Sequence, residues 1–132
     1  MKYLGVDYGS KRVGLAVSDE SLSFALPLSV LENSGNLIND IALICQEKNI
    51  GEIVVGESQD FSMKDNDIMK EINSFVLELK KKLNLPVHLQ PEFMTSVEAE
   101  RIQGKNDMLD ASSASLILKS YLDLHTNIRM NE

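Results

Sequence analysis

Apolar and polar positions alternate through the first part of the chain, and this alternation predicts three strands. Residues 2–8 and 12–18 each show the alternation, and a short Gly-Ser-Lys-Arg stretch lies between them. That spacing predicts an antiparallel hairpin, in which Gly9 is expected to supply a positive φ. Residues 24–31 form the third predicted strand. Pro27 places it near an edge of the sheet, because proline cannot donate a hydrogen bond to a neighbouring strand.

After the third strand the apolar residues recur at helical spacing, interrupted by short apolar runs. The predicted segments are helices over 36–48, 64–83, 95–103 and 109–124, and strands over 52–56 and 86–90. This order predicts an α/β fold with a five-stranded mixed sheet. Its three N-terminal strands are antiparallel, its two later strands are parallel, and helices cover both faces. In such sheets, functional residues gather at the carboxyl ends of the parallel strands.

The length and composition indicate one ordinary domain. The chain has 132 residues, of which 43% are hydrophobic and 25% charged. We expect a single domain over 1–126 followed by a short tail over 127–132. No apolar run approaches the ~20 residues that span a bilayer, and the N-terminus lacks the pattern of a signal peptide, so we expect a cytoplasmic protein without membrane contact. The single cysteine, Cys45, excludes an intrachain disulfide and is expected to be a buried small hydrophobic residue.

The net charge of −7 and the pI near 4.8 restrict the possible partners. Proteins that bind nucleic acid by charge alone are usually basic, so this composition argues against that class. A metal-dependent nuclease remains compatible with it. The carboxylates of such a site contribute to the acidity, and its bound cations reverse the local sign of the charge.

Three carboxylates lie where an α/β fold would bring them together. Asp7 ends the first strand, Glu92 follows the last strand, and Asp110 lies near the start of the last helix. Converging carboxylates repel one another unless a cation lies between them, and an all-oxygen ligand set suits Mg²⁺ or Mn²⁺. Each residue also has a simpler interpretation. Asp7 could form a turn, Glu92 could be an exposed loop residue, and Asp110 could cap its helix, although Asp107 is a rival cap.

Four basic residues lie near these carboxylates in the sequence. Lys11 and Arg12 follow Asp7, and Arg101 and Lys105 precede the last helix. All four could position a phosphate group, and ordinary surface charge is the alternative for each.

Five segments together resemble the YqgF/RuvX family of small ribonuclease H-like proteins. The resemblance covers nearly the whole chain. The segments are LGVDYGSKRVGLAVSD, ALPLSVL, IVVGES, FMTSVEAERI and LDASSASLILKSYLDLH. The family is described as Holliday junction resolvases and as nucleases that mature the 5′ end of the small-subunit (16S) ribosomal RNA precursor.

The resemblance implies a ribonuclease H-like fold and hydrolysis of phosphodiester bonds with two Mg²⁺ or Mn²⁺ ions. Asp7, Glu92 and Asp110 match the family's acidic triad, and Lys11 and Arg12 match its phosphate-positioning pair. The implied partner is nucleic acid, either precursor ribosomal RNA or branched DNA, with the ribosomal particle as a further partner. A monomer would suit RNA trimming, and a weak homodimer would suit a four-way junction.

This sequence departs from the family pattern at three places. It has Pro91-Glu92-Phe93 where the family has Asp-Glu-Arg, and Gly56-Glu57-Ser58 where the family has Gly-Leu-Pro. The basic stretch before the last aspartate is reduced to Lys105. All three changes reduce the phosphate-binding character of the chain. They keep a third function open, that of a degenerate family member that binds a ribosomal or protein partner.

Overall fold

Five strands form one sheet in the order β3-β2-β1-β4-β5. The structure is a computed structural model that describes residues 1–58, 66–92 and 108–130. Its elements are β1 (Lys2–Tyr8), β2 (Arg12–Ser18), β3 (Ala25–Glu32), α1 (Leu37–Glu47), β4 (Ile50–Ser58), α2 (Asn66–Leu83), β5 (Val87–Glu92) and α4 (Met108–Met130). β2 runs antiparallel to both of its neighbours, β1 and β3, and β4 and β5 run parallel to β1. The predicted mixed sheet is confirmed.

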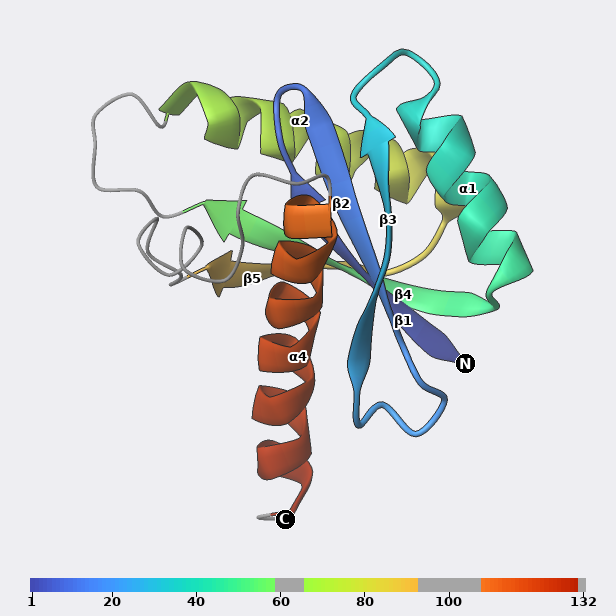
Figure 1. Cartoon of the computed structure of the whole chain (residues 1–132), viewed down its shortest axis with the longest axis vertical. Coiled ribbons are helices and arrows are strands. Elements are labelled where there is room, and N and C mark those ends of the chain that lie inside the picture. The colour runs from blue at the N-terminus through green and yellow to red at the C-terminus, as the bar shows by residue number, and fades with distance from the viewer. Residues whose placement is uncertain (59–65, 93–107, 131–132) are drawn as a thin grey trace.

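Helices cover both faces of the sheet, as the sequence predicted (Figure 1). α1 and α2 enclose one core with alternate residues of the strands, among them Leu4, Val6 and Val55. α4 encloses a second core on the opposite face with Tyr3 and Val54. The central strands are therefore buried on both sides, which explains why their sequences are almost continuously apolar. No helix within the described ranges is long and apolar enough to span a membrane.

The element boundaries differ from the prediction where pairing extends a strand or helix. β4 has nine residues rather than the predicted run over 52–56, because it pairs with β1 on one side and β5 on the other. α4 continues to Met130, beyond the predicted end at 124. β3 is an edge strand, which confirms the interpretation of Pro27. The predicted helix over 95–103 lies outside the described residues.

The prediction for Gly9 is wrong in its physical reason. No glycine in the described part of the chain has a positive φ. A Cβ atom at Gly9 would instead lie 2.6 Å from the carbonyl oxygen of Arg12, far closer than atoms pack. The hairpin turn therefore requires glycine for close backbone approach rather than for left-handed geometry.

Cys45 lies on the buried face of α1 and is 6% exposed, as expected of a small hydrophobic residue. Burial raises the pKa of its thiol to about 11, because the thiolate would lose its hydration.

Candidate active site

Asp7 lies near the carboxyl end of the central strand β1, where its side chain is half-buried. The register aligns Val6 with Val55 of β4 and Leu89 of β5, so position 7 is level with Gly56 and Gln90. Glu92 is the last residue of β5, two positions further along. Two strand spacings, about 10 Å, separate β1 from β5. The carboxyl edge of the sheet therefore holds both predicted acidic positions.

The register also places positions 7 and 92 on the same face of the sheet. Side chains alternate between the two faces of a strand. Gly5, two residues before Asp7, faces α4, and on β5 the ring of His88 stacks on Tyr121 of α4 with centroids 5.2 Å apart. Counting by twos from Gly5 and from His88 assigns positions 7 and 92 to the face that α4 covers.

The path of α4 brings its first turn toward the same place. Tyr121 packs beside Tyr3 near the start of β1, with ring centroids 6.2 Å apart. One to two turns earlier the helix crosses Gly5, where an added Cβ would lie 2.7 Å from the Leu118 Cβ and 2.9 Å from the Ala114 carbonyl oxygen. From Gly5 to position 7 the strand rises about 6.6 Å, which is the rise of about four residues along a helix. Continuing by that amount from Leu118 and from Ala114 leads to positions 114 and 110, in the first two turns of α4.

The β1–β2 turn, which carries Lys11 and Arg12, is fixed from the β3–α1 loop. The Asn33 side-chain amide donates to the Gly9 carbonyl oxygen at 2.8 Å, and the Asn33 backbone N–H donates to the Lys11 carbonyl oxygen at 2.9 Å. The side chains of Lys11 and Arg12 are exposed. These two bonds fix the backbone that carries both cationic residues at the edge where Asp7 lies. No role of Asn33 was predicted from the sequence.

A second turn, between β2 and β3, is organised by Asp19. Its carboxylate accepts hydrogen bonds from the Ser21 hydroxyl and from the backbone N–H groups of Ser23 (2.9 Å) and Phe24 (2.8 Å). These bonds stabilise the charged form, led by the bond from Ser21, and lower the pKa of Asp19 to about 2. In the sequence, Asp19 stands out only as the last residue of the LGVDYGSKRVGLAVSD segment. The serines two and four residues later are the local signal that could have identified a turn-forming aspartate.

The remaining predicted site residues lie partly or wholly outside the described part of the chain. For Glu92 and Asp110 only the backbone is described, and Arg101 and Lys105 fall within the range that the structure leaves undescribed. Among the side chains that are described, no three His, Cys, Asp or Glu residues converge as a metal site. The role of the triad therefore stays a prediction, supported by backbone positions.

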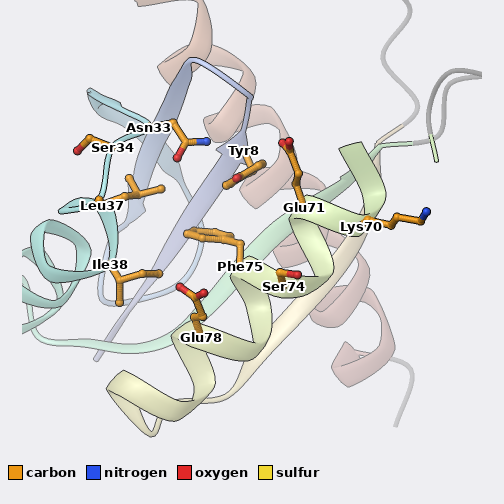
Figure 2. A pocket seen from close by; sticks show the side chains of 11 residues that line it. Tyr8, Asn33, Ser34, Leu37, Ile38, Lys70, Glu71, Ser74, Phe75 and Glu78 are labelled. Atoms are coloured by element: carbon orange, nitrogen blue, oxygen red, sulfur yellow. The ribbon is translucent and has the colours of Figure 1, made fainter. Parts of the chain in front are cut away.

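A cavity of about 430 Å³ lies on the other side of the sheet, between α1 and α2. Tyr8 and Phe75 form its aromatic wall, with ring centroids 4.7 Å apart, and Glu71 and Glu78 line it from α2 (Figure 2). Tyr8 follows Asp7 directly and so faces the opposite way. This cavity is separated by the sheet from the face to which positions 7 and 92 belong, so it is not the predicted catalytic site.

Comparison with known proteins decides the family. The family described as RuvX, Holliday junction resolvase, matches residues 1–124. The chain belongs to this family. A relative from Maridesulfovibrio salexigens, named "Putative pre-16S rRNA nuclease", is 32% identical and covers 92% of this chain and 98% of its own length. A relative of the same name from Nitratidesulfovibrio vulgaris is 33% identical and covers 98% of this chain and 89% of its own.

Solved structures confirm the ribonuclease H-like fold of this RuvX-family chain. RuvC of Thermus thermophilus in complex with a Holliday junction substrate superimposes with a TM-score of 0.64 at 14% identity and covers 96% of each chain. The fowlpox virus Holliday junction resolvase gives a TM-score of 0.55 at 16% identity, with 94% of this chain and 99% of that chain covered. At these identities the likeness concerns the fold alone. The expected family and fold class are thus confirmed.

Proposed function

We propose that this RuvX-family chain is a divalent-metal-dependent nuclease that processes the 5′ end of precursor 16S ribosomal RNA in the cytoplasm. The observation that supports the proposal is the backbone arrangement around Asp7. The register assigns positions 7 and 92 to one face at the carboxyl edge, and the path of α4 over Gly5 leads position 110 toward them. The relatives named as pre-16S rRNA nucleases support RNA as the substrate. The nuclease unit would be the single domain over 1–126.

The donor set fits two hard cations. Carboxylate oxygens are the ligands that Mg²⁺ and Mn²⁺ prefer, and strand-end positions on a buried sheet give such ligands a rigid base. Asp7, Glu92 and Asp110 would hold two Mg²⁺ or Mn²⁺ ions. Such a pair, when bound, activates water and stabilises the leaving oxygen of a phosphodiester.

The residues around the carboxylates would orient the RNA. Lys11 and Arg12 would contact the phosphate next to the scissile bond from a turn whose carbonyls are held by Asn33. Arg101 and Lys105 would contact the backbone beyond it. Asp7 lies on the central strand, bordered by β2 and β4, so we expect it to be the carboxylate held most rigidly among those that would hold the ions.

Cleavage assays with Mn²⁺ test this proposal. Wild-type protein, Asp7→Asn and the control Asp40→Asn are given a precursor 16S RNA fragment and a four-way DNA junction. Asp40 lies in the first turn of α1 and has no role in the proposed site. Removing a metal ligand costs several kcal/mol of transition-state stabilisation, so Asp7→Asn should reduce the rate by about 10³-fold while the control cleaves normally. Wild-type turnover that Asp7→Asn leaves unchanged would refute the role of the triad.

The second candidate is resolution of branched DNA. It is favoured by the family description and by the fold likeness to RuvC. Cutting a four-way junction symmetrically requires two related active sites, so junction cleavage by a homodimer would select this candidate, and RNA cleavage by a monomer would reject it. Failure of both substrates at millimolar Mn²⁺ would support the degenerate binding module that the change to Phe93 allows.

A further inference from the structure

Lysines gather at the amino edge of the parallel strands, opposite the edge that holds Asp7. Lys48 follows α1 directly, Lys80, Lys81 and Lys82 end α2, and Lys2 begins β1. These five, called here the lysine end, are five of the 13 Lys and Arg residues in a chain of net charge −7. Lys2 is half-buried and the other four are exposed.

The fold brings Lys2, Lys48 and the three lysines of α2 to one edge, although these three segments are distant in sequence. The Lys2 backbone N–H donates to the Asn49 carbonyl oxygen at 3.1 Å, which joins the start of β1 to the end of α1. The segment after α2 is joined to the same edge, since the Ile53 N–H donates to the Pro86 carbonyl oxygen at 3.0 Å. Figure 1 shows the N-terminus and the ends of α1 and α2 on one side of the molecule, and the ends of β4 and β5 on the other.

Helix geometry accounts for only part of this arrangement. Lysines in a last helical turn are favourable because they face the negative end of the helix dipole. That reason applies to Lys48 and to the three lysines of α2, and the connections from α1 to β4 and from α2 to β5 bring both helix ends to the amino edge. It does not apply to Lys2, which begins a strand. Glu47 and Glu52 lie at the same edge, and the five lysines outnumber these two carboxylates. An excess of positive charge at one edge of an acidic protein is the electrostatic pattern expected of a contact with nucleic-acid phosphates.

We propose that the lysine end is a second RNA-contacting surface, which holds the phosphate backbone of the substrate away from the point of cleavage. This inference rests on the proposed function. Lysine contacts phosphate as a point charge and reads no base, so the surface would bind RNA without sequence preference. The nine residues of β4 separate the two edges by about 30 Å, which corresponds to about nine stacked nucleotides.

The salt dependence of RNA binding tests the proposal, with binding measured in EDTA so that no cleavage is needed. The variant K81Q/K82Q removes two charges from the lysine end. The control K70Q/K119Q removes two lysines located elsewhere, on α2 and α4. Each phosphate contact contributes about 0.7 to the slope of log affinity against log salt for a single strand, so two lost contacts lower the slope by about 1.4. Between 50 and 200 mM salt, wild type should therefore lose about sevenfold more affinity than K81Q/K82Q, and the control should behave like wild type.

The length of the RNA gives a second readout. The difference between K81Q/K82Q and wild type should appear with RNA that extends about 20 nucleotides from the cleavage site, and vanish with about four. Equal salt slopes for wild type and K81Q/K82Q on the long RNA would overturn the proposal, as would an equal effect of the control variant. Equal slopes combined with lost binding to phosphatidylserine vesicles would assign the surface to a membrane instead. Because Asp7→Asn should keep the wild-type salt slope while losing cleavage, failure of the lysine end and failure of the triad are distinguishable.

Discussion

Gly5 is the point at which α4 lies directly on β1, and its substitution by alanine should disturb both stability and the candidate site. The added Cβ would lie 2.7 Å from the Leu118 Cβ and 2.9 Å from the Ala114 carbonyl oxygen. Ordinary contact begins at 3.4 Å, so the helix has to move outward from 2.7 Å to at least that distance, by about 0.7 Å. One of the two obstacles is backbone, so a side-chain rotation cannot remove the clash.

The expected cost of Gly5→Ala is about 3 kcal/mol, at the upper end for overpacking of a buried site. For a domain of 132 residues this lowers the melting temperature by about 10 °C. The displacement of α4 would also move position 110 relative to position 7, and misplacement of about 1 Å can cost up to about 100-fold in rate. Cleavage by the folded variant should therefore fall more than its folded fraction does.

Urea denaturation provides the measurement, and Gly35→Ala is the matched control. A Cβ at Gly35 meets nothing within 4 Å, so this variant should stay within about 0.5 kcal/mol of wild type or gain slightly in stability. If Gly5→Ala unfolds at the same urea midpoint as Gly35→Ala, the close approach of α4 to β1 is wrong. The inference that position 110 reaches position 7 would then lose its main support.

Three further predictions concern the turns and the buried thiol. Asp19→Asn should be less stable than wild type at neutral pH, because the folded-state pKa of Asp19, about 2, lies below its ordinary value of 3.8. The stability difference between the two proteins should be full above about pH 4 and disappear as the pH falls through 2. Thermal melts across that pH range measure it. Asn33→Ala removes the donor to the Gly9 carbonyl oxygen, so it should lower the free energy of unfolding by about 1 kcal/mol in urea titrations. It should also lower kcat on RNA, and full activity would show that the turn does not need this hydrogen bond. Cys45 should resist iodoacetamide at pH 8 in the native protein and react on unfolding, because burial raises the pKa of its thiol to about 11 and blocks access of the reagent. Mass spectrometry measures the labelling, and rapid labelling of the native protein would contradict this prediction.

Local pattern was sufficient for most of the elements. The period-two alternation identified β1 and β2 to the residue, and the helical stripe of α2 predicted its end at residue 83. Pro27 indicated an edge strand from its chemistry alone. These features depend on neighbours a few residues apart, which is why the sequence carries them.

Features that depend on distant contacts were predicted less well. The extra length of β4 comes from pairing on both sides, and nothing in its own residues requires it. The roles of Asn33 and Gly9 depend on atoms from another turn or from across the hairpin, so the sequence predicted a different reason for Gly9 and no role for Asn33. The cavity beside Tyr8 was not predicted, since its lining comes from separate elements.

The sequence by itself determined the type and order of the elements, the family resemblance and the identity of three candidate carboxylates. Only the tertiary structure decided that positions 7 and 92 belong to one face at the carboxyl edge, where α4 crosses β1, and that lysines from three separate segments lie at the opposite edge. The physical reason is range. Hydrophobic periodicity records each element's local environment, whereas strand register and helix crossing are fixed by packing between residues tens of positions apart, such as Gly5 and Leu118.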